Sequence, residues 1–113
     1  MTAHFEDIVL VHDGDFTTNV PALVCHHSPT GFSWGYHGSG PADLALNVLE
    51  WALQDAGYAG HRVKCWNGDC FGLAWDLHQQ FKREVIALIA PAGGTISAAF
   101  VRNWLKGHIN GDE

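Results

Sequence analysis

Residues 32–53, FSWGYHGSGPADLALNVLEWAL, decide the fold that we expect for this chain. Their first part alternates, because smaller or polar residues separate Phe32, Trp34 and Tyr36. A period of two is typical of a β-strand, since successive side chains point to opposite faces. We therefore predict a strand with one aromatic face at the start of this stretch.

A helix is predicted directly after this strand. The turn of residues 37–40 leads into Pro41, and proline is favoured at the first helical position because its missing N–H would be unpaired there anyway. Apolar residues then recur at helical spacing, so we expect the helix over residues 41–56, with Gly57 as its stop. Asp43 falls at the third helical position, where its carboxylate can accept hydrogen bonds from N–H groups of the first turn.

The segment WGYHGSGPADLALNVL, residues 34–49, resembles the hallmark of a family of small uncharacterised proteins from bacteria, phages and other mobile elements. That hallmark is approximately WGY, one residue, and then GSGPADLAL. His37 stands where the family more often has glycine. Weaker similarity covers residues 81–82 and 96–104. The resemblance implies a phage or mobile-element setting, and it implies no established activity.

Hydrophobic periodicity and turn residues predict the remaining elements. We expect strands at residues 8–11, 20–25, 62–64 and 95–96, and helices at about residues 71–89 and from Ser97 to near Gly107. The predicted fold class is α+β, in the order β-β-β-α-α-(β)-α. Three or four strands form a small antiparallel sheet, and about three helices pack on one of its faces.

Composition limits the kinds of protein that the chain can be. At 113 residues, with 47% hydrophobic and 16% charged residues, it is expected to form one globular domain over residues 1–113. The net charge of -6 argues against direct binding to nucleic acid and fits a basic protein partner.

No apolar run reaches the roughly 18 residues of a membrane span, and the N-terminus does not have the pattern of a signal peptide. With three cysteines, an odd number, the chain is expected in the cytoplasm.

The end of the aromatic strand and the start of the helix form the first candidate site. The candidate ligand-binding residues are Trp34, Tyr36, His37, Gly38, Ser39, Gly40 and Asp43. A glycine-rich turn at a helix start can bind an anion, although this turn lacks the lysine of a P-loop and Asp43 supplies a negative charge of its own. A neutral or partly cationic ligand, stacked on the aromatic rings and hydrogen-bonded by Asp43, is a second reading. A third is structural, with the glycines allowing close packing and the aromatic rings filling the core.

Metal binding and catalysis find less support in the sequence. Cys25, His26 and His27 could join Cys65 and Cys70, but the four residues between the last two cysteines do not match a usual zinc knuckle. Adjacent histidines on a strand also point to opposite faces, so at most one could join Cys25. No spacing places a nucleophile beside a base. We expect no metal, no cofactor and no enzymatic activity.

A protein-binding surface is the remaining candidate. Exposed aromatic rings among acidic residues are typical of protein interfaces, and the residues proposed for one are Asp13, Asp15, Glu50, Trp51, Asp55 and Trp66. We expect a non-enzymatic phage-type or mobile-element-type protein that binds a basic surface of a host protein, most concretely as a counter-defence inhibitor in the manner of an anti-CRISPR protein. The alternative is a domain that binds or sequesters a small, nucleotide-like ligand.

Overall fold

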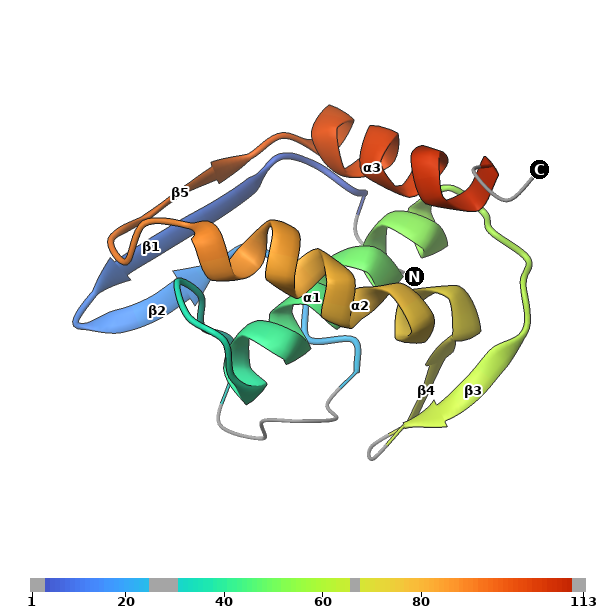
Figure 1. The fold of residues 1–113 in the computed structure, drawn as a ribbon, viewed down its shortest axis with the longest axis horizontal. Helices are drawn as coiled ribbons and strands as arrows, with labels where there is room; N and C mark the ends of the chain where they lie inside the picture. Colours follow the sequence, from blue (N-terminus) through green and yellow to red (C-terminus); the bar gives the residue numbers. More distant parts are fainter. Residues whose placement is uncertain (1–3, 25–30, 66–67, 111–113) are drawn as a thin grey trace.

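The computed structural model of the protein describes residues 4–24, 31–65 and 68–110. Its elements in chain order are β1 (Ile8–Asp13), β2 (Asp15–Thr18), α1 (Ser39–Asp55), β3 (Arg62–Cys65), β4 (Gly68–Phe71), α2 (Gly72–Glu84), the 3-10 turn η1 (Ile86–Leu88), β5 (Gly93–Ile96) and α3 (Ala98–Asn110). The fold is α+β, with three α-helices and small antiparallel sheets, which confirms the predicted class (Figure 1). Within the described ranges, none of the helices has the length and apolarity needed to cross a membrane.

The larger sheet joins the two ends of the described chain. Its strand order is β2-β1-β5, and all pairs are antiparallel. Ile8 and Leu10 of β1 point into the core, whereas Val9 and Val11 are nearly half exposed. The helices therefore cover one face of this sheet, and the opposite face meets solvent. β3 and β4 form a separate hairpin at the other end of the molecule (Figure 1).

α1 is the central element of the fold. Every residue from Gly40 to Leu53 is buried, including the polar Asp43, Asn47 and Glu50. α2 packs along α1, and α3 and the β3–β4 hairpin also contact the core around it (Figure 1). Neighbouring elements thus enclose residues 40–53 of this helix on all sides.

The two ends of α1 show how its sequence fixes its length. The helix begins at Ser39, two residues earlier than predicted, and Gly38 is its N-cap. Asp43 is therefore the fifth helical residue, so its predicted place at the third helical position is wrong. At the other end Gly57 adopts a φ of +73°, and its N–H bonds to Gln54 O while Tyr58 N–H bonds to Leu53 O. These two bonds form a Schellman motif, as the predicted glycine stop requires.

The predicted strand over residues 20–25 is wrong as far as the structure describes it. Residues 20–24 form no strand. Their backbone bonds to a side chain of α1, because Asn47 Oδ1 accepts the N–H groups of Leu23 and Val24 at 2.7 and 2.8 Å. Asn47 Nδ2 donates to Val24 O at 2.7 Å. The side chain of one asparagine thus replaces a neighbouring strand, and this segment passes along the helix.

The predicted aromatic strand is also wrong. Residues 31–38 have no regular secondary structure. Gly35 has a φ of +83°, a left-handed conformation that interrupts an extended strand, and its N–H bonds to Ile86 O at 3.1 Å. Trp34 is consequently buried, while Tyr36 is 49% exposed. The two rings do not share one face.

The C-terminal half follows the prediction more closely. The short strands at 62–64 and 95–96 are confirmed as parts of β3 and β5, whereas β4 was not predicted. The helix expected to 89 ends at Glu84 and is followed by the 3-10 turn. Ser97 Oγ accepts Phe100 N–H at 3.1 Å, which confirms the predicted cap of the last helix. That helix continues past Gly107 to Asn110.

Candidate ligand-binding site

A cavity of about 300 Å³ opens at the start of α1. β2, the segment before α1 and the first turn of α1 each contribute to its walls. The lining residues are Phe16, Gly31, Phe32, Ser33, Tyr36, Ser39 and Gly40. The walls thus combine three aromatic rings with two serine hydroxyl groups.

The aromatic side of the cavity packs against the core through Phe16. Phe16 meets the buried ring of Trp34 edge-on, with ring centroids 4.8 Å apart, and His12 stacks on Phe16 at 3.8 Å. Phe16 is therefore held from two sides, yet it remains 37% exposed. The indole N–H of Trp34 is buried and has no acceptor among the described residues, which is uncommon in a folded protein.

Two glycines of the turn make room for the side chains of the site. A Cβ atom at Gly40 would lie 2.0 Å from Ser33 Oγ, and one at Gly38 would lie 2.5 Å from the ring of Tyr36. Ser33 Oγ is in turn 2.8 Å from the hydroxyl oxygen of Tyr36. The glycines therefore allow Ser33 and Tyr36 to fold over the helix start and to form a hydrogen-bonded pair there.

The electrostatic character of the cavity comes from the helix. The first intrahelical bond runs from Ala42 N–H to Gly38 O, so the N–H groups of Ser39 and Gly40 precede the helical bonding pattern. The first turn of α1 holds no acidic residue, and none of the described residues that line the cavity is charged. The positive end of a 17-residue helix therefore faces a cavity with no competing carboxylate among its described lining residues.

The predicted ligand-binding residues divide into three groups. Tyr36, Ser39 and Gly40 line the cavity, and Gly38 supports the ring of Tyr36. Trp34 and Asp43 are buried and lie outside the lining, and His37 is exposed and also outside it. Sequence reasoning missed Phe16, Phe32 and Ser33 as wall residues. Phe32 was visible as part of the aromatic alternation, but Phe16 reaches the cavity only through the pairing of β2 with β1.

The predicted protein-binding residues do not form one surface. Glu50 and Trp51 are buried, so their expected exposure is wrong. Glu50 accepts hydrogen bonds from Phe71 N–H at 2.8 Å, from Gln54 at 2.7 Å and from Arg62 at 3.2 Å. Trp66 lies outside the described residues.

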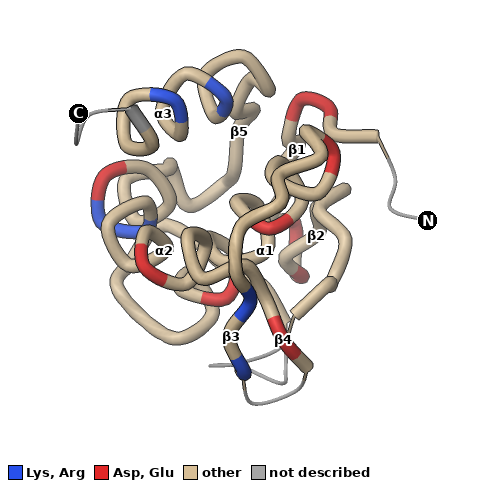
Figure 2. Tube along the Cα trace, turned by 90° about the vertical axis from the view of Figure 1, so that its right-hand side faces the viewer, with Lys and Arg blue, Asp and Glu red and all other residues tan. Residues whose placement is uncertain are grey.

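Two of the predicted acidic residues lie at the larger sheet, and a third lies at the end of α1. Asp13 and Asp15 are exposed at the turn between β1 and β2, and Asp55 lies at the end of α1, 3.0 Å from His4 and 3.8 Å from Arg102. All Lys and Arg residues of the chain occur at position 62 or later. Figure 2 shows the consequence, with Lys and Arg on α2, α3 and β3 and none on β1 or β2. The turn end of this sheet thus carries two exposed acidic residues and no Lys or Arg, and Val9 and Val11 are exposed on β1.

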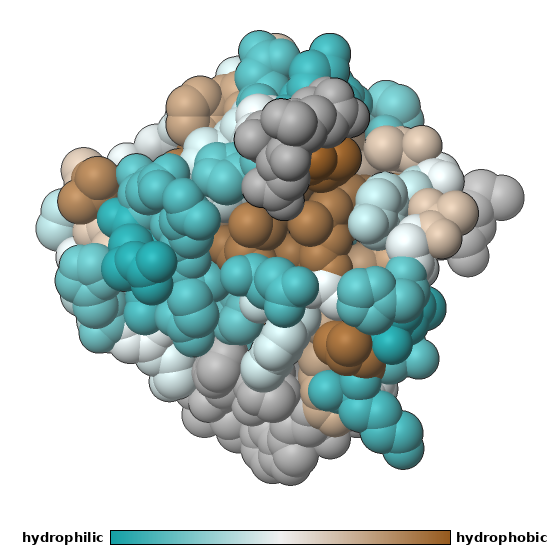
Figure 3. All heavy atoms as spheres, turned by 45° about the vertical axis from the view of Figure 1, so that its right-hand side comes forward, coloured by the Kyte–Doolittle hydropathy of each residue, from teal (hydrophilic) through white to brown (hydrophobic). Residues whose placement is uncertain are grey.

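A second cavity of about 330 Å³ lies between α1 and α3. Its lining residues are Ala52, Leu53, Ala56, Arg102, Leu105, Lys106 and Ile109. Figure 3 shows apolar side chains gathered in a hollow on this face. Specific small-molecule sites combine an apolar wall with convergent polar groups. The cavity at the start of α1 meets this description more closely, because hydroxyl and backbone N–H groups converge there.

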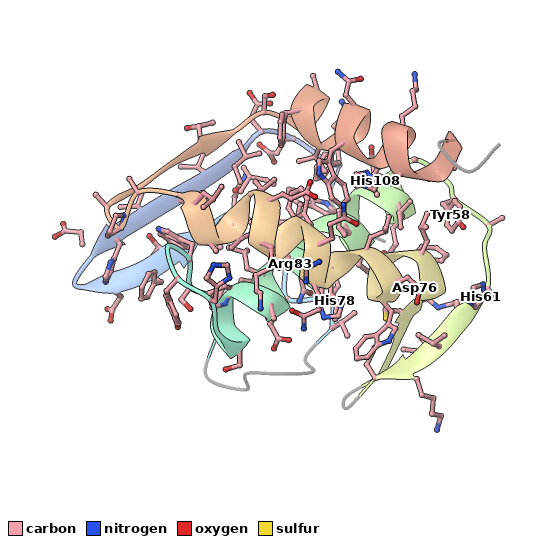
Figure 4. All side chains as sticks on the ribbon, in the orientation of Figure 1. Tyr58, His61, Asp76, His78, Arg83 and His108 are labelled. Carbon is pink, nitrogen blue, oxygen red and sulfur yellow. The ribbon has the colours of Figure 1, made fainter. Side chains whose placement is uncertain are left out.

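Several polar side chains of the described residues lie on α2 and on the elements beside it (Figure 4). Figure 4 shows Tyr58 and His61 in the connection before β3, with Asp76 on α2 and His108 on α3. Among the described residues, neither His61 nor His108 is hydrogen-bonded or ion-paired to a carboxylate. His108 Nδ1 donates to Trp104 O at 2.7 Å, so its Nε2 in the neutral ring accepts from Gln80 at 3.1 Å. These contacts join α2 to α3.

Within residues 4–24, 31–65 and 68–110, no three His, Cys, Asp or Glu residues are grouped so that they could hold a metal ion. Cys25, His26 and His27 lie outside the described residues. Cys65 and Cys70 lie next to each other on the β3–β4 hairpin.

Comparison with known proteins identifies the family. Residues 3–65 match the model of a family of unknown function, DUF6166. The chain belongs to this family. The DUF6166 match contains β1, β2, α1 and β3, and therefore the whole lining of the cavity at the start of α1. No curated protein and no solved structure matches the chain.

Proposed function

We propose that the protein binds a small, planar, anionic ligand of mononucleotide size or smaller in the cavity at the start of α1. The observation that carries the proposal is the convergence of aromatic rings, hydroxyl groups and a helix N-terminus on one cavity. The aromatic rings offer stacking surfaces, and the backbone N–H groups offer donors for an anionic group. The second reading of this site, a ligand hydrogen-bonded by Asp43, loses support because Asp43 is buried outside the lining.

The size and charge of the cavity define the ligand further. A volume of about 300 Å³ is at the lower end of the range for small-molecule sites. No lysine or arginine is among the described lining residues, so the helix N-terminus supplies the attraction for an anion. Weak binding of a monoanion or dianion is therefore expected, and a triphosphate is too large and too highly charged for this cavity.

Calorimetry with a set of matched probes tests the proposal. AMP, adenosine and inorganic phosphate are titrated separately into the protein. AMP is expected to bind more tightly than adenosine, because only AMP places an anion at the helix N-terminus, and more tightly than phosphate, because only AMP offers a ring for stacking. Equal affinity for AMP and inorganic phosphate would contradict a role for the aromatic wall.

Two variants localise the binding. Tyr36→Ala removes an exposed aromatic wall and is expected to weaken AMP binding about tenfold, since stacking of one base contributes about 1–3 kcal/mol. Phe100→Ala is the matched control, because Phe100 is exposed to a similar degree, 46% against 49% for Tyr36, and is not among the lining residues. Unchanged AMP affinity in Tyr36→Ala would place the ligand elsewhere.

A second proposal keeps the expected interaction with a host protein, acting in counter-defence in the manner of an anti-CRISPR inhibitor. The acidic turn end of the β2-β1-β5 sheet supports it. Asp13 and Asp15 are exposed beside the apolar Val9 and Val11, a combination that fits a basic partner with some apolar surface. The phage or mobile-element setting comes from the resemblance of residues 34–49.

Charge reversal separates this proposal from the first. An Asp13→Lys/Asp15→Lys protein is expected to lose retention on a column of immobilised lysozyme, a basic probe protein, whereas Asp76→Lys on the exposed face of α2 retains it. A second column that carries the purified counter-defence partner in place of lysozyme applies the same comparison of variants to that partner. Equal retention of both variants would exclude the sheet face as the surface that binds a basic protein. Neither outcome decides the first proposal, which is tested by AMP binding.

A further inference from the structure

The β3–β4 hairpin carries two thiols on one face. Val63 pairs with Cys70 and Cys65 pairs with Gly68, so the two cysteines occupy diagonal positions on the same face of the hairpin. Their sulfur atoms lie 2.9 Å apart, and neither cysteine forms a disulfide. Two reacting groups held side by side react faster than groups that must first meet by diffusion.

The two thiols differ in their access to solvent. Cys70 is fully buried, whereas Cys65 is partly exposed. Cys65 lines an open cavity of about 370 Å³ together with Lys64, Gly68 and Asp69. A small oxidised thiol compound can therefore reach Cys65 from solvent, whereas Cys70 is enclosed by the protein.

The surroundings of Cys70 keep it protonated. Burial and the hydrogen bond to Cys65 raise the pKa of the Cys70 thiol above its ordinary value, and the negative charge of Glu50 acts in the same direction. The Cys70 S–H can thus donate to the sulfur of Cys65. Cys65 thus carries the solvent-accessible sulfur, and Cys70 carries the buried, protonated sulfur.

We propose that Cys65 and Cys70 form a reversible dithiol–disulfide pair that exchanges with small-molecule disulfides of the glutathione type, with Cys65 as the attacking sulfur and Cys70 as the resolving sulfur. This modification site lies on the β3–β4 hairpin, at the opposite end of the molecule from the β2-β1-β5 sheet (Figure 1). It is independent of the ligand proposed for the cavity at the start of α1.

The exchange takes place in two balanced steps. First, the thiolate of Cys65 attacks one sulfur of glutathione disulfide, so that a Cys65–glutathione bond forms, the glutathione S–S bond breaks and one glutathione thiolate leaves. Then the sulfur of Cys70 attacks the sulfur of Cys65, the mixed S–S bond breaks, and the proton of Cys70 passes to the departing sulfur, so that the second glutathione leaves as a thiol. The two protein thiols are oxidised, and one glutathione disulfide is reduced to two molecules of glutathione.

Peptide mass spectrometry of the full chain tests the pair directly. The protein is equilibrated over a series of ratios of glutathione to glutathione disulfide, alkylated and digested with trypsin without reduction. Cleavage after Lys64 and Lys82 yields a peptide of residues 65–82 that contains both thiols, while Cys25 falls in a different peptide. As glutathione disulfide increases, this peptide is expected to lose both alkyl labels and the mass of two hydrogen atoms, and dithiothreitol is expected to restore them.

Two variants test the assigned order of attack. In Cys70→Ala, Cys65 is expected to retain a stable glutathione adduct, because no resolving sulfur is present. In Cys65→Ser, Cys70 is expected to stay unmodified, because it is buried. The wild-type result is decisive if the buried substitution prevents folding. A peptide 65–82 that stays fully alkylated at every ratio, or a glutathione adduct that persists on the wild-type protein, would overturn the proposal.

Discussion

The side chain of Asn47 pairs with the backbone of Val24 in both directions, accepting its N–H at 2.8 Å and donating to its carbonyl oxygen at 2.7 Å. The same amide also accepts Leu23 N–H and donates to Asp43 O. All four bonding positions of a fully buried amide are thus used. This residue fixes the segment before the cavity against the central helix.

Removal of this amide is expected to destabilise the fold strongly. Asn47→Ala leaves several buried backbone groups without partners, so the free energy of unfolding should fall by roughly 2–4 kcal/mol. Asn47→Asp should also destabilise, because a carboxylate cannot donate to the carbonyl oxygens of Val24 and Asp43. Urea unfolding measures both, with Asn103→Ala on the exposed side of α3 as the control. A loss in Asn47→Ala no greater than in the control would contradict this assignment.

The buried carboxylate of Glu50 is expected to stabilise the β3–β4 hairpin against α1. In Glu50→Gln the new amide group faces two donors, Gln54 and Arg62, so at least one hydrogen bond is lost. Because Arg62 is partly exposed and can turn toward Asp69, the expected loss is about 1–3 kcal/mol. Glu6→Gln, at an exposed position, is the control for loss of one negative charge. Equal urea midpoints for the two variants would show that the buried bonds contribute little.

Neighbouring glycines of β5 provide a matched test of backbone geometry. Gly93 has a φ of +110°, and a Cβ atom there would lie 2.0 Å from the carbonyl oxygen of Leu10. Gly93→Ala is therefore expected to lower the free energy of unfolding by about 2–4 kcal/mol. A Cβ atom at Gly94 meets nothing within 4 Å, so Gly94→Ala should stay within about 0.5 kcal/mol of the parent. Thermal unfolding of the pair checks the prediction, and similar losses at both positions would refute it.

The contact between α2 and α3 is expected to weaken in acid. The hydrogen bonds from Gln80 and from the Trp104 indole hold the pKa of Glu84 below its ordinary value of 4.5. A lowered folded-state pKa means that the stabilisation is complete above about 4.5 and is lost as the pH falls through the folded-state value. Glu84→Gln should thus be less stable than the parent at neutral pH, and the difference should vanish well below pH 4.5.

Urea unfolding at several pH values measures this difference. The same substitution in a Trp104→Phe background should give a smaller difference at neutral pH, because one of the hydrogen bonds to Glu84 is already missing. A stability difference that stays constant from neutral to acid pH would assign the effect to packing instead of charge.

The sequence predicts the helices well because their signals are local. Pro41, the apolar repeat after it and Gly57 lie within one segment, and they place α1 correctly except for its first two residues. That error has a physical cause, since the helix extends back to Ser39 where Gly40 can pack against Ser33. The cap at Ser97 is also a local signal and is confirmed.

The strands and the site depend on distant contacts, so local patterns predict them less well. The segment before Cys25 has the composition of a strand, but Asn47 of α1 supplies its partner. The aromatic alternation breaks at Gly35, whose conformation is linked to the hydrogen bond that its N–H donates to Ile86 O. Part of the candidate site, Tyr36 and Gly40, follows from the turn itself, whereas Phe16 joins it through tertiary packing.

The pairing of β1 with β5 has a consequence for synthesis of the protein. Ile8 pairs with Ile96, so β1 is synthesised well before β5, the strand that pairs with it (Figure 1). Until then β1 has one unpaired edge, and such edges on nascent chains promote association with other chains. Rapid production of this protein is therefore expected to require chaperones that hold the nascent chain. Slower translation of α3 should favour aggregation over folding, because it prolongs the time during which the edge of β1 is unpaired.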